Sequence, residues 1–132
     1  MPEPSTYDYA VIRVVPRVER EEFVNAGVVV SCPALRFLAA AVELDAARLS
    51  CLDAAVDLEL VKRHLDGIVT ICRGGEAAGA IGRLTEKERF RWLTAPRSTI
   101  IQFSPAHTGR CDDPALVLER LMENVVRAPR TR

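Results

Sequence analysis

The segment from Tyr7 to Val15 carries apolar residues in a two-residue alternation, which is the period of a β-strand. One face presents Ala10, Ile12 and Val14, which we expect to point into the hydrophobic core. The opposite face also carries aromatic and aliphatic side chains, so it should be partly covered too. A strand that is covered on both faces lies away from the edge of a sheet. The segment therefore predicts a sheet with this strand inside it.

Three further segments are rich in β-branched or apolar residues and are bounded by Pro or Gly, which is typical of strands. They comprise residues 28–32, 36–44 and 98–103. Asn25 and Gly27 precede the first of them and suit a β-bulge or a backbone position with positive φ. The alanine run within 36–44 leaves a helix as an alternative there. We expect Ser98–Phe103 to enter the middle of the sheet, beside Tyr7–Val15.

Helix signals occupy most of the remaining chain. Residues 58–72 repeat apolar side chains every three or four positions, which predicts an amphipathic helix. The N-terminal signals of the predicted helices are Asp45, Asp57, the pair Thr85 and Glu88, and Asp113 followed by Pro114. The resulting order is βββαααβα. It predicts an α+β fold, with a mainly antiparallel sheet of about four strands and helices packed on one face.

The length of 132 residues suits a single domain, 1–132, with loose ends expected at 1–6 and 128–132. The formal net charge is zero, from 18 basic and 18 acidic residues, so the chain has no global attraction to nucleic acid or anionic membranes. The longest apolar run, Phe37–Val42, is too short for a membrane span, and no signal peptide is visible. We therefore expect a cytoplasmic protein. Its four cysteines include no Cys-x-x-Cys pair, which predicts free thiols.

Reactive side chains are densest between Ser104 and Asp112, which we expect to form a polar loop before the last helix. His107, Thr108 and Arg110 precede the helix N-terminus, where unpaired backbone N–H groups attract anions. An aspartate in the cap position competes with such an anion, so a capped helix after an ordered turn is the preferred interpretation. The loop mixes His, Cys and Asp without a recognised metal or nucleophile spacing. We assign no metal, no cofactor and no catalytic residue, and leave open whether the protein is an enzyme.

Arg13 and Arg97 each occupy or border a strand that we expect to be central. A half-buried guanidinium needs a partner, and an ion pair within the sheet is preferred to a bound anion. The candidate anion-binding or ligand-binding residues are Arg13, Asn25, Arg97, Ser98, His107, Thr108 and Arg110. Two other features receive structural interpretations. His64 should be a half-buried packing residue, and Gly74–Gly82 should be a flexible connection, because it follows a helix and lacks the ending of a phosphate-binding loop.

Four segments of the chain together resemble one bacterial family. They are Tyr7–Pro16, Glu22–Val28, Pro96–Gln102 and His107–Gly109, the last followed by Asp113 and Pro114. The combination is similar to the uncharacterised domain of unknown function 3037, over nearly the whole chain. The resemblance implies no activity, cofactor or catalytic residue. It implies a partner, since genes of this family often lie beside one for a HipA-like kinase.

These observations favour a non-enzymatic accessory or protein-interaction module. The resemblance connects it with a HipA-like kinase, and so with a kinase-associated or toxin–antitoxin role. The alternative is a phosphate-ester or nucleotide-binding protein or enzyme that uses Arg13, Arg97, His107 and Arg110. Nucleic-acid binding is a second alternative, which the zero net charge disfavours.

Overall fold

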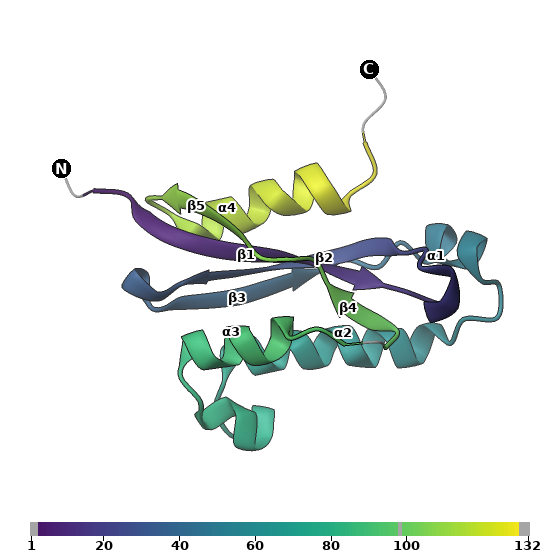
Figure 1. Ribbon diagram of the computed structural model, residues 1–132, viewed down its shortest axis with the longest axis horizontal. Helices are drawn as coiled ribbons and strands as arrows, with labels where there is room; N and C mark the ends of the chain where they lie inside the picture. Colours follow the sequence, from purple (N-terminus) through teal and green to yellow (C-terminus); the bar gives the residue numbers. More distant parts are fainter. Residues whose placement is uncertain (1–2, 98, 130–132) are drawn as a thin grey trace.

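The computed structural model describes residues 3–97 and 99–129 and shows an antiparallel sheet with helices on both sides (Figure 1). The strands are β1 (Ser5–Val14), β2 (Val24–Cys32), β3 (Phe37–Val42), β4 (Ile101–Phe103) and β5 (His107–Cys111). Their order is β3-β2-β1, and both β4 and β5 pair with the remaining edge of β1. The α+β class and the antiparallel sheet are confirmed, with five strands where about four were predicted. Residues 36–44 contain a strand, as predicted, and not the alternative helix.

β1 occupies the interior of the sheet, as its alternation predicted, because it has neighbours on both edges. Ala10, Ile12 and Val14 are fully buried. The predicted β-bulge is present, since the register between β1 and β2 shifts where Arg13 meets Asn25. β1 begins at Ser5, so part of the expected loose end belongs to a strand. Residues 1–2 and 130–132 of the expected ends lie outside the described residues.

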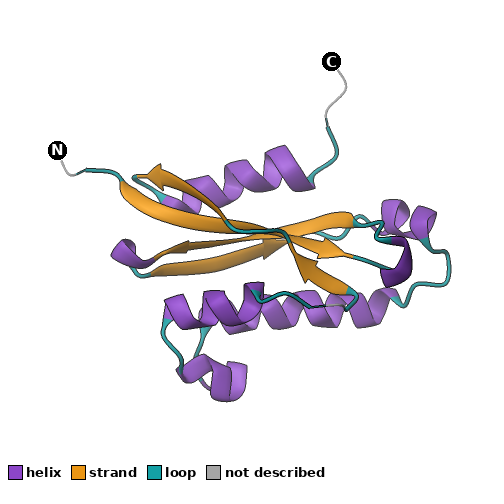
Figure 2. Ribbon diagram, in the orientation of Figure 1, coloured by secondary structure: helices purple, strands orange, loops and turns teal. Residues whose placement is uncertain are grey.

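The helices begin at the predicted caps. They are α1 (Ala46–Leu52), α2 (Leu58–Arg73), α3 (Glu86–Thr94) and α4 (Pro114–Leu121), which continues as a π-helical turn, Met122–Val126 (Figure 2). Asp45, Asp57 and Asp113 each accept hydrogen bonds from backbone N–H groups of the first turn. Thr85 and Glu88 form the complete capping box. None of these helices, within the described ranges, is long and apolar enough to cross a membrane.

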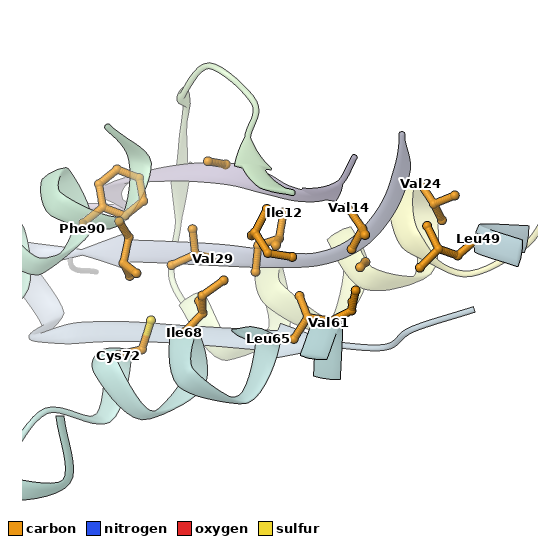
Figure 3. Close-up of a cluster of buried hydrophobic side chains, with 14 residues drawn as sticks. Ile12, Val14, Val24, Val29, Leu49, Val61, Leu65, Ile68, Cys72 and Phe90 are labelled. Carbon is orange, nitrogen blue, oxygen red and sulfur yellow. The ribbon is translucent and has the colours of Figure 1, made fainter. Parts of the chain in front are cut away.

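Helices cover both faces of the sheet, where the sequence predicted only one. On one face α1, α2 and α3 bury a cluster that includes Ile12, Val29 and Leu65 (Figure 3). On the other, α4 and its π-helical turn pack on Val28 and Val30 of β2. The reason lies in β2, whose consecutive valines point alternately to the two faces. Both faces are then apolar, and each must be covered.

The segment expected to be a polar loop forms β5 instead, which is the main correction to the predicted topology. The strand predicted at Ser98–Phe103 corresponds to β4, which pairs with β1 as expected. It lies at the rim of the sheet and not in its middle, because β4 and β5 share the outer edge of β1. Together they act as one edge strand interrupted by a bulge at Pro105. Ser104 maintains the pairing across it: its N–H donates to Val11 O at 2.9 Å, and its hydroxyl accepts from Val11 N at 2.8 Å. Edge strands commonly carry such polar sequences and bulges.

Residues Gly74–Gly82, expected to be a flexible connection, lie mainly in a compact 3-10 segment, Glu76–Arg83. Its two ends touch, because a Cβ added to Gly82 would lie 2.2 Å from the carbonyl oxygen of Gly75. Only glycine permits this approach. The glycines therefore close a turn between α2 and α3 and bring α3 back against α2.

Candidate functional site

The predicted site residues lie in three separate places. Arg13 and Asn25 face each other across β1 and β2. The Arg13 guanidinium lies 4.3 Å from the centre of the Phe23 ring, in place of the expected ion pair. Asn25 Nδ2 donates to Val125 O at 3.0 Å, which attaches β2 to the end of the last helix. Arg13 Nε and Asn25 Oδ1 are buried and have no hydrogen-bond partner among the described residues.

His107, Thr108 and Arg110 lie on β5, along the other half of β1. The His107 ring contacts the Tyr9 ring, with their centres 5.2 Å apart. Thr108 Oγ1 donates to Asp8 Oδ1 at 2.6 Å. The side chains of His107 and Thr108 therefore have partners on the strand beside them. Ser98 is the one candidate that lies outside the described residues.

A cleft of about 470 Å³ separates the end of β5 from α4, and Arg110 lines it. Two acids line the same cleft, Asp112 and Asp113. Asp113 Oδ1 accepts from the N–H groups of Ala115 and Leu116, so the N-terminus of α4 is already capped by a carboxylate. This geometry agrees with the preferred interpretation of a capped helix and argues against an anion there.

Arg97 lies on the opposite side of the sheet, beside an open, mainly apolar pocket. The pocket has a volume of about 520 Å³ and is lined by α2, by α3 and by residues 99–103 at β4. These three elements lie together on one side of the sheet in Figure 1. The pocket floor is formed by side chains of the main core, Ile68, Leu93 and Ile101. Arg13, His107 and Arg110 do not line it.

Trp92 and Arg97 form one rim of this pocket. The Arg97 guanidinium lies 4.4 Å from the centre of the indole, and its Nη2 donates to Trp92 O at 2.6 Å. Trp92 is nevertheless 40% exposed. The stacking holds a cation and a large aromatic surface beside an open apolar floor.

The chain matches the model of a protein family of unknown function, DUF3037, over residues 9–126. The chain belongs to the DUF3037 family. No curated protein and no solved structure matched it. The family match confirms the resemblance seen in the sequence and adds no activity to this DUF3037 domain.

Sequence reasoning missed three residues of the pocket in this DUF3037 domain. Arg63 and His64 line it from α2, and Trp92 lines it from α3. His64 was interpreted as a half-buried packing residue, and this was wrong, because its side chain is exposed. The helical repeat places it beside the apolar stripe and does not show which neighbouring element leaves that edge uncovered. A usable signal was Gly67, a glycine in the middle of a long helix and one turn beyond Arg63.

The thiols of the described residues are free, as predicted, and three of the four are buried. Burial raises the pKa of Cys72 to about 12. Burial, together with the neighbouring Cys32, raises the pKa of Cys111 as well. A raised pKa opposes formation of the reactive thiolate. Within the described ranges, no three or more His, Cys, Asp or Glu side chains gather as a metal site would require.

Proposed function

We propose that this protein is a non-enzymatic interaction module that binds another protein at the pocket between α2, α3 and β4. One observation carries the proposal: an exposed Trp92, stacked with Arg97, lies at the rim of an open apolar pocket. Tryptophan and arginine beside a desolvated pocket are the residues that dominate the binding energy of protein interfaces. The expected partner is the HipA-like kinase that the family resemblance implies.

The alternative of a phosphate-ester or nucleotide site required Arg13, Arg97, His107 and Arg110 to converge. Arg13 and Arg97 lie on opposite faces of the sheet, and the other two lie on β5. Because these four residues do not share one site, we prefer the interaction module to the nucleotide site. The pocket beside Arg97 has an apolar floor, which suits a protein partner better than a phosphate.

The test is analytical size exclusion of the purified protein mixed with a HipA-like kinase, the partner that the family resemblance implies. We expect a complex with the wild type and at least a tenfold weaker complex with Trp92→Ala. Leu116→Ala is the matched control, since Leu116 is a similarly exposed apolar residue on α4, across the sheet. Equal complexes with all three proteins would remove the pocket as the interface. Absence of any complex with the wild type would remove the kinase as the partner.

A further inference from the structure

We infer that the occupant of the α2–α3–β4 pocket is an acidic, apolar segment of a partner protein: a large apolar side chain enters the pocket while neighbouring carboxylates meet its rim. This inference rests on the proposed function, because it specifies the chemistry of the partner at that same pocket. Three features of the pocket lead to it.

The first feature is the sign of the charge. The ionisable side chains that line the pocket are Arg63, His64 and Arg97, and no acid among the described residues lines it. The protein as a whole has a net charge of zero, so this excess of basic side chains is local. Arg63 and His64 form no hydrogen bond or ion pair through their side chains with any residue of the described ranges. The charge of Arg63 and the ring N–H group of His64 are therefore available to a partner, and a cation on that partner would be repelled by the two arginines.

The second feature is the apolar interior. Ile68, Leu93 and Ile101 form the floor and are almost completely buried, so the pocket opens directly onto the main core. Phe103 and Ile100 add partly buried apolar surface to the wall. A small hydrophilic anion would leave this surface in contact with water. A segment with an apolar side chain beside a carboxylate would bury the apolar floor and also pair with the basic side chains of the rim.

The third feature is Gly67, which lines the pocket in the middle of α2. Glycine destabilises a helix interior relative to alanine. Packing against the rest of the protein does not explain it, because an added Cβ would have no atom from outside its own stretch of helix within 4 Å. A glycine at such a position allows another chain to approach the helix backbone closely. The open space above Gly67 is therefore where we place the backbone of the partner segment.

The fluorescence of Trp92 provides the test, since it is the only tryptophan in the chain. The probes are the peptide acetyl-Leu-Phe-Asp-Glu-Leu-amide, its Asn/Gln isostere, its Lys/Lys counterpart, and dodecanoate. We expect saturable binding of the acidic peptide below about 1 mM, roughly fivefold weaker binding of the isostere, and none of the lysine peptide. Raising the salt concentration should weaken the acidic peptide and leave the isostere unchanged.

Variants separate a binding role from a structural one. Arg63→Gln and Arg97→Gln should each weaken the acidic peptide several-fold, while Arg110→Gln on β5 should not. Gly67→Ala should raise the melting temperature and yet weaken the peptide, a combination that a purely structural role would not give.

Three results would each overturn the inference. Equal affinity for the acidic peptide and its isostere would show that the negative charge of the peptide does not contribute to binding. Absence of binding by every peptide would show that the pocket does not bind a peptide segment. Tighter binding of dodecanoate than of the acidic peptide would assign the pocket to a small amphipathic anion. The proposed function fails separately, when Trp92→Ala leaves the kinase complex intact.

Discussion

Arg89 is a charged residue that is only 8% exposed, between α2 and α3. Its Nη1 donates to the carbonyl oxygens of Ile71 and Cys72 at 2.8 and 2.7 Å, and its Nε donates to Leu84 O at 3.1 Å. The last carbonyls of a helix have no intrahelical donor, so this guanidinium caps α2 from a neighbouring helix. Gly74 leaves room for this guanidinium, because a Cβ added to Gly74 would lie only 2.8 Å from Arg89 Nη1. Arg89 thus holds α3 against the C-terminal end of α2, and these two helices line the pocket.

Replacing Arg89 by methionine should cost about 2–4 kcal/mol of stability, because three hydrogen bonds to buried or partly buried carbonyls are lost and only Ile71 O keeps another donor, the N–H of Gly74. Arg89→Lys should recover part of this loss, since an ammonium donates to carbonyls without the fork of a guanidinium. Urea unfolding measures both. Arg91→Met, on the exposed side of α3, is the control and should stay within about 0.5 kcal/mol of wild type. Equal losses for the Arg89 and Arg91 methionine variants would show that the cap contributes nothing.

The cysteines should differ sharply in reactivity. Cys51 is exposed, whereas Cys72 is buried and has a pKa of about 12. In a disulfide-exchange assay at pH 8 the native protein should show one fast thiol, which Cys51→Ala removes. Two or more fast thiols in the native protein would contradict the burial.

The folded pKa of Cys72 lies above its unfolded value of about 8.5, so its contribution to stability is complete below that pH and is lost as pH rises toward 12.

The elements were predictable where local chemistry determines them. Each helix has its cap in the first turn, and the capping box at Thr85 and Glu88 can be recognised from four residues. β5 could not be recognised, because His107–Cys111 has no apolar alternation. Its pairing depends on the edge of β1, and the Tyr7 ring covers Gly109 so closely that an added Cβ would lie 2.6 Å from it. The pocket could likewise not be predicted from the sequence, since Arg63 on α2 and Arg97 after α3 come from segments that only the fold brings together.

The capping box predicts a specific pH dependence. The N–H and the hydroxyl of Thr85 donate to Glu88 Oε1 at 3.1 and 2.9 Å, and these bonds hold the pKa of Glu88 below its usual value. A lowered pKa adds stability above the unfolded pKa of about 4.3, and this is lost as pH falls through the folded pKa. Glu88→Gln should therefore lower the urea midpoint at pH 7 and converge with wild type near pH 3.

Glu86→Gln, in the same first turn, is the control for the general effect of a negative charge near a helix N-terminus. It should lower the midpoint less at pH 7 than Glu88→Gln does. Identical pH profiles for the two variants would assign the effect to the helix dipole and not to the box.

At the scale of the whole molecule, the two faces of the sheet are stabilised by different helices. α2 and α3 build the pocket on one face, and α4 covers β2 and β3 on the other. Arg127 ties the end of the last helix to Glu43, Glu119 and Glu123 at 3.3, 2.8 and 3.1 Å. These carboxylates raise the pKa of Arg127. Substitutions in α4 should therefore leave the structure of the pocket unchanged.

Arg127→Gln tests this separation. Hydrogen exchange should accelerate in residues 114–126, which lose their attachment to the end of β3, while α2 keeps its wild-type protection. Arg120→Gln, on the same helix, is the control and should change neither region. Equal acceleration in α2 and α4 would show that the two layers unfold as one unit.

The most direct measurement of the central claim, that partners bind at the α2–α3–β4 pocket, is a nitrogen-15 NMR titration with the acidic peptide. We expect the indole N–H of Trp92 and the amides of residues 63–71 and 99–103 to shift saturably, while those of β5 stay in place. Shifts centred on β5 and the N-terminus of α4, or no saturable shift at the indole, would contradict it.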